Sequence, residues 1–232
     1  MSAKLIGVGV WCVVALCWTM PVAAQSDEAK RVSLAATVVD EIMAAPDGGV
    51  PGSVLDNADA IAIFPSTIKA GFIFGAHRGR GVIIGRDPES DTWSSPAFLT
   101  LTGGSFGLQI GGQSVDLVLI VMNRRGLENL LRNEFKVGGN ASAVVGPVGR
   151  DVEASTDIQL QAEILSYSRT RGVFAGVVLQ GSTIRADRDA NERFYGVRLD
   201  STDIVLDGKA EDPFDATAVA ELTDTVSRYT SR

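Results

Sequence analysis

The chain is poor in the residues from which most catalytic and metal centres are built. It has one histidine, His77, and two cysteines, Cys12 and Cys17. Both cysteines lie in an N-terminal segment that we expect to be removed, so the remaining chain would hold no disulfide, no thiolate and no cysteine metal site. A zinc or copper centre would then have to rely on carboxylates, because only one histidine is left. We therefore expect neither a metal nor another cofactor.

The chain also lacks an excess of basic residues. Its 21 Lys and Arg stand against 28 Asp and Glu, a net charge of −7. Removal of Lys4 with the N-terminal segment leaves 20 against 28, a net charge of −8. General nucleic-acid binders carry a net basic face, so this balance argues against nucleic acid as a partner. Binding of an anion must come from a local basic patch.

The N-terminus has the organisation of a secretory signal peptide. Lys4 is followed by the 16 apolar residues LIGVGVWCVVALCWTM and then by PVAAQS, which is a positive start, a hydrophobic stretch and small residues before a cut. We predict cleavage after Ala24, hence a periplasmic or secreted protein. The alternative is an uncleaved membrane anchor, although a span needs about 20 apolar residues. Neither cysteine follows a small residue, which argues against a lipoprotein.

Helices are predicted at both ends of the segment 25–232. Residues 26–45 carry apolar side chains at helical spacing after a capping serine or aspartate. Residues 213–231 form a second amphipathic segment, with Asp212 as the cap and Pro213 at the first helical position. No repeat or long linker divides the chain, so we predict one domain.

Between these helices lies a glycine-rich β region at residues 70–122. Ten glycines occur in the 42 residues from 71 to 112, where ordinary usage gives about three. They separate apolar runs of strand length, and glycine lets strands bend sharply or approach another backbone closely. We therefore predict an α+β fold, in which a strongly curved antiparallel sheet or partial barrel packs with the N- and C-terminal helices.

Three stretches match catalytic or metal-binding patterns but lack the required context. Gly-Gly-Ser-Phe-Gly around Ser105 matches a hydrolase nucleophile elbow, yet strand-like sequence follows it and His77 precedes it. Ser66 opens an S-x-x-K match without the S-D-N and K-T-G elements that accompany it in enzymes. Asp187 begins a calcium-loop pattern that has Glu at position 6 and Arg at position 12, where Gly and Glu are needed. We predict that the chain is not an enzyme and assign no catalytic residue.

One stretch, KAGFIFGAHRGRGVIIGRD, concentrates positive charge without an acidic residue before Asp87. Its glycines predict a hairpin tip at GAHRGRG, where backbone N–H groups and arginines would bind phosphate. A basic tip of this kind suits lipid headgroups, and the alternative is a solvated turn that only aids solubility. The candidate lipid-binding residues are Lys69, His77, Arg78, Gly79, Arg80, Gly81 and Arg86.

Five ordered stretches resemble the successive blocks of the SYLF lipid-binding domain family. They are AIAIFPSTIKAGFIFGAHRGRGVI, GGSFGLQIGGQSVDLVLIVMN, GNASAVVGPVGRDVEA, SYSRTRGVFAGVVLQGSTI and NERFYG. The resemblance covers about residues 30–200, and five blocks in order are far more specific than any single motif. It implies a glycine-rich α+β domain that binds phospholipids at a membrane surface. Eukaryotic members recognise phosphoinositides, whereas the signal peptide leads us to expect anionic or phosphorylated phospholipids of the envelope as partners here.

The resemblance also implicates the N-terminal helix in membrane contact. The side chains that would insert are Val32, Val39, Ile42 and Met43, and the alternative is that this helix packs on the sheet. A second possibility for the whole protein is an envelope scaffold whose ligand is another protein. Its surface would be the acidic segment 199–232, which holds eight Asp or Glu against three Lys or Arg.

Overall fold

The fold is described from a computed structural model of the chain. The described residues are 25–45, 49–138, 143–147, 162–170, 173–174, 179, 181–211 and 213–230, with the backbone alone at 70–75, 105–112 and 173–174. The expected cleavage site and the whole segment before it lie outside these residues, as does the expected cap Asp212.

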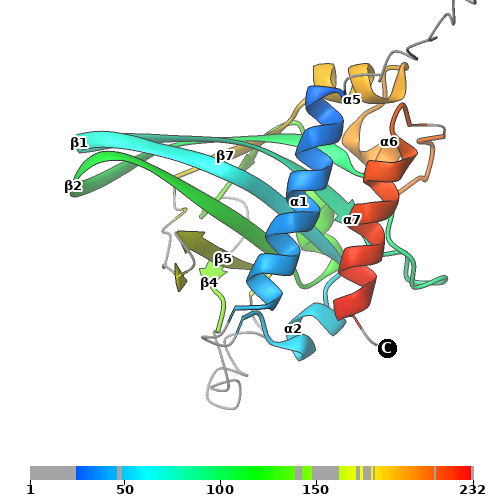
Figure 1. Cartoon of the computed structure of the whole chain (residues 1–232), viewed down its shortest axis with the longest axis horizontal. Coiled ribbons are helices and arrows are strands. Elements are labelled where there is room, and N and C mark those ends of the chain that lie inside the picture. Colours follow the sequence, from blue (N-terminus) through cyan, green and yellow to red (C-terminus); the bar gives the residue numbers. More distant parts are fainter. Residues whose placement is uncertain are drawn as a thin grey trace, which may run out of the picture.

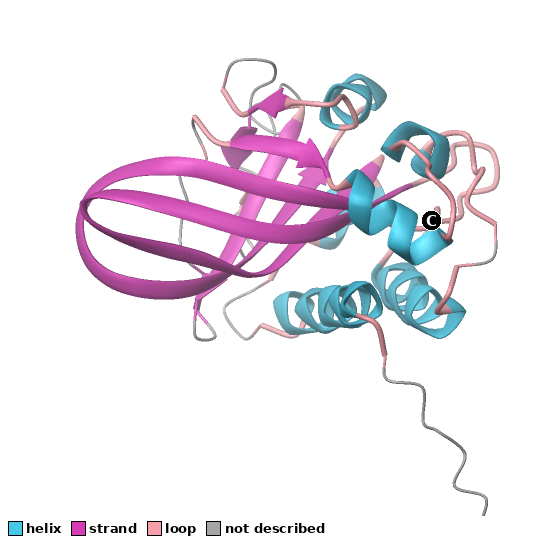
Figure 2. Cartoon of the chain, turned by 90° about the horizontal axis from the view of Figure 1, so that it is seen from above, coloured by secondary structure: helices cyan, strands magenta, loops and turns pink. Residues whose placement is uncertain are grey.

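A long two-stranded ribbon is the main feature of the fold. β1 (Ala60–Gly85) pairs antiparallel with β2 (Ala97–Val121), from Ala60 opposite Val121 to Ile83 opposite Ala97. The turn between them spans residues 86–96, the polar stretch RDPESDTWSSP. The ribbon runs away from the helices and curls back on itself, as Figure 2 shows. Register shifts between Phe64 and Thr67 and between Gly71 and Ile73 mark its irregular points.

Glycine makes this fold-back possible, because it brings the two halves of β1 together. A methyl group on Gly79 would lie 2.5 Å from Oγ1 of Thr67. One on Gly81 would meet the carbonyl oxygen of Ile63 and lie 2.5 Å from the ring of Phe64. No side chain larger than hydrogen fits at either position without displacing its neighbours. Close approach of two backbones, which the glycine density of this region allows for, is therefore the role of Gly79 and Gly81, where the sequence predicted a hairpin tip.

Short strands complete a seven-stranded sheet around the ribbon. Every pair is antiparallel except β4 with β5, which is parallel. The predicted α+β class, with a strongly curved and mainly antiparallel sheet, is confirmed. The short strands are β3 (Phe135–Lys136), β4 (Ala143–Val145), β5 (Ile164–Thr170), β6 (Val173–Phe174) and β7 (Thr183–Ala186).

The two terminal helices pack side by side across the sheet (Figure 1). The helices are α1 (Asp27–Met43), α2 (Gly52–Asp56), α3 (Arg124–Leu130), α5 (Arg188–Tyr195), α6 (Ser201–Val205) and α7 (Ala216–Tyr229). α1 begins as predicted, since the Ser26 side chain accepts a hydrogen bond from the Ala29 N–H. Within the described residues, no helix is both long enough and apolar enough to cross a membrane.

The start of α7 differs from the prediction. Pro213 lies before the helix, and Asp215 is the cap, because its carboxylate accepts the N–H of Ala218 at 3.0 Å. The predicted apolar stripe is nevertheless correct. Leu222 and Val226 are buried, and Val219 and Tyr229 pack against the core.

We predict that Gly81→Ala lowers the free energy of unfolding by about 1–3 kcal/mol, because the added methyl group overpacks the fold-back. Urea unfolding followed by circular dichroism measures the effect. Gly52→Ala is the matched control, since a methyl group there has nothing within 4 Å. It should leave stability unchanged or raise it by up to about 1 kcal/mol. Equal stability of the two variants would show that the halves of β1 do not meet as described.

Candidate functional site: a basic sheet face

The predicted hairpin tip is wrong, because residues 75–81 lie in the middle of β1. They pair with residues 99–105 of β2, and the chain reverses only at 86–96. Neither Gly79 nor Gly81 has a positive φ. These glycines serve close approach between the halves of β1 and not a turn. An anion nest built from turn N–H groups is therefore absent at this stretch.

The strand separates the basic block between two faces. Alternate side chains of a strand point to opposite sides, and here His77, Gly79 and Gly81 are buried while Arg78 and Arg80 are exposed. The two arginines therefore project together from one face of the ribbon. The neighbours opposite them on β2, Thr102 and Thr100, are not buried either.

Two further strands extend this face with more positive charge. Thr102 pairs with Thr183 of β7, and Thr183 pairs with Lys136 of β3. Thr100 pairs with Arg185 of β7 in the next row. The exposed residues Arg78, Arg80, Lys136 and Arg185 therefore share one side of four adjacent strands, which we call the basic face.

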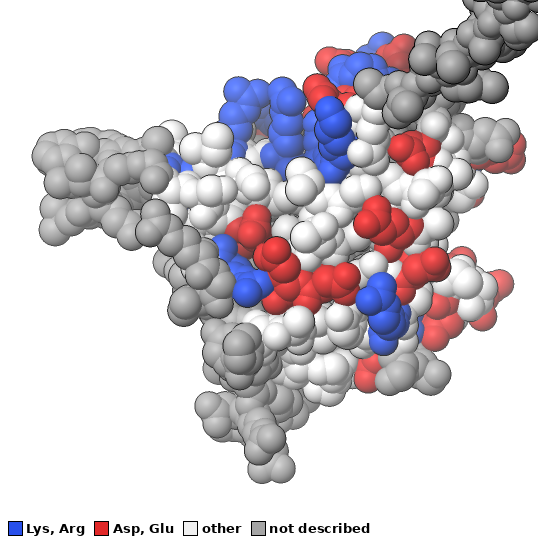
Figure 3. Space-filling view, viewed as in Figure 1, with Lys and Arg blue, Asp and Glu red and all other residues white. Residues whose placement is uncertain are grey.

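The basic face lies beside the N-terminal half of α1. Arg31 of α1 is buried, with its guanidinium 5.2 Å from the centre of the Phe98 ring and 3.3 Å from Asp187 Oδ2. Burial is the main cause that lowers the pKa of Arg31, and the positive charge of Arg80 adds to it. Figure 3 shows Lys and Arg gathered over the strands next to this end of α1, with Asp and Glu prominent farther along. The helices thus cover one part of this side of the sheet, and the basic face is the neighbouring part that they leave uncovered.

One acidic residue is bonded to the basic face. Glu134 pairs with Arg185 at 2.6 Å and with Lys136 at 3.4 Å. These hydrogen bonds lower the pKa of Glu134, so it stays ionised. No ion pair is described for Arg78 or Arg80, which leaves both guanidinium groups available to a ligand.

Sequence reasoning missed Lys136 and Arg185, because β3 and β7 are far from β1 along the chain. The only available signal was the alternation in Thr-Ile-Arg-Ala, where Thr183 and Arg185 flank a buried isoleucine. That alternation shows which side of the strand is polar but not which strand lies next to it.

Lys69 lies on the other half of β1, opposite Gln113. It is half-buried, and burial lowers its pKa. Its charge in turn lowers the pKa of His77. Lys69 therefore lies near His77, which is on the buried side of the ribbon, and it is not part of the basic face.

His77 was expected among the lipid-binding residues, but its side chain is buried and has a structural role. Its side chain is 4% exposed, and Nε2 lies 2.8 Å from Oγ of Ser182. Burial lowers the pKa of His77, and the charge of Lys69 lowers it further. The imidazole is therefore neutral at pH 7 and contributes no charge to a headgroup site.

Arg86 also belongs to the structure of a turn and not to a ligand site. Its guanidinium pairs with both oxygens of Asp91, at 2.6 and 3.0 Å, and donates to the carbonyl of Asp56. It also lies 5.6 Å from the centre of the Trp93 ring. Arg86 is buried and bonded to Asp91 and Asp56, so it stabilises the β1–β2 connection.

The expected membrane-contact side chains of α1 are part of the core. Val32, Val39 and Ile42 are buried, and Met43 packs against the same cluster. The structure therefore has the alternative arrangement, in which α1 packs on the sheet and does not expose these side chains. The apolar stripe of α1 faces β1 and α7. On the outer side of α1, the apolar side chain of Leu34 is 51% exposed.

The enzyme-like motifs are accounted for by the fold. Ser105 lies inside β2, opposite Gly75, and the strand continues after it to Val121 where a nucleophile elbow would turn into a helix. Ser66 sits at a positive φ of 52° where β1 is irregular, and its N–H donates to Asp116. Asp187 caps α5 by accepting the Ala190 N–H and also pairs with Arg31. Across the described residues, no three His, Cys, Asp or Glu side chains are grouped to hold a metal ion.

Comparison with known proteins adds a family to this geometry. Residues 102–229 match the family model Ysc84, described as Las17-binding protein actin regulator. The human SH3 domain-containing YSC84-like protein 1 is 34% identical over 180 residues, which are 77% of this chain and 52% of that protein. LAS seventeen-binding protein 3 of Saccharomyces cerevisiae is 32% identical over 201 residues, 84% of this chain and 42% of its own length. The chain thus spans about half the length of the curated relatives it matches.

Because His77 is neutral in the folded protein, stability should depend on pH. The unfolded chain takes up a proton near pH 6.5, whereas the lowered pKa of His77 delays protonation of the native state. The free energy of unfolding should therefore fall as the pH drops below about 6.5, by at most about 1.4 kcal/mol per pH unit.

Urea unfolding between pH 8 and 5.5 tests this, with His77→Gln as the control. Glutamine does not titrate and keeps an amide that can bond Ser182, and the chain has no other histidine. A variant whose stability changes with pH as steeply as the wild type would contradict the prediction.

Proposed function

The chain belongs to the Ysc84 family, whose description and whose yeast relative's name both refer to binding, and we propose that it is a non-enzymatic binding domain whose ligands are anionic phospholipids. The ligand atoms would be the phosphate oxygens of lipid headgroups. The protein would bind the membrane surface peripherally, through the basic face and without inserting α1.

The observation that carries this proposal is the basic face itself. Four exposed cations from β1, β7 and β3 lie on one side of the sheet in a chain of net charge −7. Arginine presents donors in a planar fork that matches two phosphate oxygens. Against an anionic membrane, each basic residue near the surface adds about 1 kcal/mol. Because the four side chains lie on the same side of neighbouring strands, they can face one membrane surface together.

We propose further that the protein works outside the cytoplasm. Lys4 and the apolar run after it would direct export, and cleavage after Ala24 would release the domain into the periplasm or the medium. The ligands there would be anionic glycerophospholipids of the envelope. Binding through charges that are exposed in the folded domain suits such a setting, because it requires no partner module.

We predict that vesicles containing phosphatidylglycerol pellet the wild-type protein and that Arg78→Glu/Arg80→Glu abolishes this binding. Both side chains are exposed and have no described ion pair, so the variant should fold normally; circular dichroism checks this. The matched control is Arg124→Glu/Arg198→Glu, which makes the same charge change at two exposed sites on α3 and after α5. Equal loss of binding in both variants would reduce the effect to net charge and refute a local site.

A protein ligand is the second candidate, and two observations favour it. The family description and the yeast relative's name refer to Las17 or LAS seventeen binding. The acidic segment 199–232 also carries Phe214, which is 73% exposed. Exposed aromatic side chains are common anchors of protein interfaces. In this case lipid affinity would be incidental.

Salt separates the two candidates. Raising the salt from 0.1 to 1 M shortens the Debye length from about 10 to about 3 Å, so binding of the basic face to vesicles should be largely lost. Sedimentation of the wild-type protein at each concentration measures it. Vesicle binding that persists in 1 M salt would mean that apolar contacts hold the protein and would count against the basic face.

A further inference from the structure

An apolar patch lies exposed where the chain leaves the end of α5. Phe214 is 73% exposed and Val197 is 53% exposed, and no other large apolar side chain of the described residues is more exposed than Phe214. The two side chains belong together, because the Phe214 ring lies close to Gly196, where an added Cβ would be 3.2 Å from the ring. We call Phe214 and Val197 the Phe214 patch. Aromatic rings contribute much of the binding energy when an interface buries them.

The backbone beneath the Phe214 patch is fixed to the core. The N–H of Phe214 donates to the carbonyl of Phe194 at 3.0 Å. Phe194 is 1% exposed and packs edge-on against Phe98, with ring centres 5.1 Å apart. An aromatic residue that is held in place before binding loses less conformational freedom on contact, which favours it as the anchor of an interface.

The surroundings of the Phe214 patch are acidic. Phe214 belongs to the segment 199–232, whose eight Asp or Glu and three Lys or Arg give it a charge of −5. Glu211 and Glu192 lie close to the patch along the chain. Both are exposed, and neither has an ion pair within the described residues. A surface that covers this patch must therefore offer cations as well as apolar contact.

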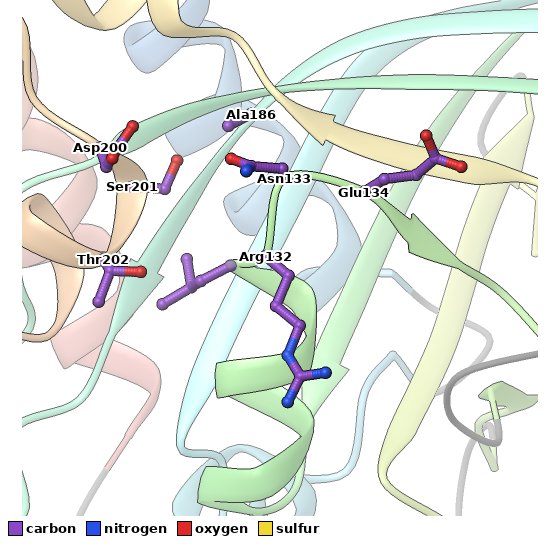
Figure 4. Close-up of a pocket in the computed structure, with 8 residues that line it drawn as sticks. Arg132, Asn133, Glu134, Ala186, Asp200, Ser201 and Thr202 are labelled. Carbon is purple, nitrogen blue, oxygen red and sulfur yellow. The ribbon is translucent and has the colours of Figure 1, made fainter.

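The basic face of the same chain has this chemistry. Its four cations stand against one acidic residue, Glu134, which gives a local charge of +3. In Figure 4 the Glu134 side chain extends away from Ser201 and Thr202, in keeping with its bonds to the cations of β3 and β7. Arg78 and Arg80 have no described ion pair, so their guanidinium groups are available to carboxylates and to the face of an aromatic ring. The alkyl stems of the two arginines also give a ring apolar contact.

We propose that the Phe214 patch of one copy of this chain binds the basic face of a second copy. Local charges of −5 and +3 meet in this contact, and the aromatic ring lies on the arginine side chains. The two surfaces differ, so the contact is heterologous, and each pair keeps one free surface of each kind to continue head to tail. The protein ligand considered above is then the chain itself. The contact needs no lipid, but an anionic membrane competes for the same basic face.

Sedimentation velocity of the full chain, without lipid and at about 0.1 M salt, tests this contact. We expect the sedimentation coefficient of the wild type to rise with protein concentration. Phe214→Ser should weaken association about tenfold or more, because it removes the aromatic anchor. Val145→Ser is the matched control and should associate like the wild type. Val145 is 54% exposed and lies on β4, at the opposite edge of the sheet from β3.

A mixture of two variants tests whether these two surfaces pair with each other. Arg78→Glu/Arg80→Glu loses the basic face and keeps the Phe214 patch, whereas Phe214→Ser loses the patch and keeps the face. We expect each variant alone to sediment as a monomer at concentrations where the wild type associates. A 1:1 mixture should form a dimer that grows no further, because its two remaining surfaces do not match. Unchanged circular dichroism shows that both variants are folded.

Three results would overturn the proposal. The first is a wild type whose sedimentation coefficient does not change with concentration. The second is equal association of Phe214→Ser and Val145→Ser. The third is a mixture that stays monomeric like its two components.

Vesicles containing phosphatidylglycerol separate this contact from the proposed function. Phe214→Ser should pellet with them as the wild type does, because lipid binding uses the basic face alone. A wild type that associates without lipid but does not pellet refutes lipid binding and leaves the contact between copies standing. A wild type that pellets but stays monomeric without lipid refutes the contact and leaves lipid binding standing.

Discussion

The close approach of the two halves of β1 is the constraint on which the rest of this structure depends. Gly79 and Gly81 stand where any side chain would collide with Thr67 or Phe64. Without that approach the 26-residue strand could not fold back, and its first half would lose the cover that buries it. With Gly79 and Gly81 turned toward the first half of β1, their neighbours Arg78 and Arg80 must point to the opposite side, because side chains alternate along a regularly paired strand. Packing therefore decides which charges of the basic block reach solvent.

A net acidic protein can present a positive surface only if its few cations are placed together. Here the sheet does this, since pairing of β1, β2, β7 and β3 aligns Arg78, Arg80, Arg185 and Lys136 on one side. The helices limit the extent of that surface, because α1 covers the adjoining part of the sheet with apolar side chains and the buried Arg31. The same packing withdraws the apolar stripe of α1 from any membrane. The apolar stripe of α1 therefore adds nothing to the attraction of the basic face for an anionic surface.

Local structure was largely predictable from the sequence, whereas the site was predictable only in part. A helix cap depends mainly on neighbouring residues, so the Ser26 cap of α1 follows from sequence, although α7 begins at Asp215 and not at the expected Asp212. Glycine density correctly indicated a curved sheet, but it cannot separate a turn from a close approach, which is why Gly79 was assigned to a hairpin tip. Arg86 is as basic as its neighbours, and only the fold shows its carboxylate partner. Lys136 and Arg185 join the site through strand order, which no local pattern contains.

Charge on an exposed face attracts anionic surfaces but distinguishes poorly between them. Exposed arginines on a sheet face can bind the phosphate of any glycerophospholipid, and salt screens all such contacts alike. Discrimination needs groups that are removed from water and that lose hydrogen bonds when the wrong ligand binds. The arginines of the basic face are exposed and stay in contact with water. The face alone therefore selects for negative charge and not for one particular headgroup.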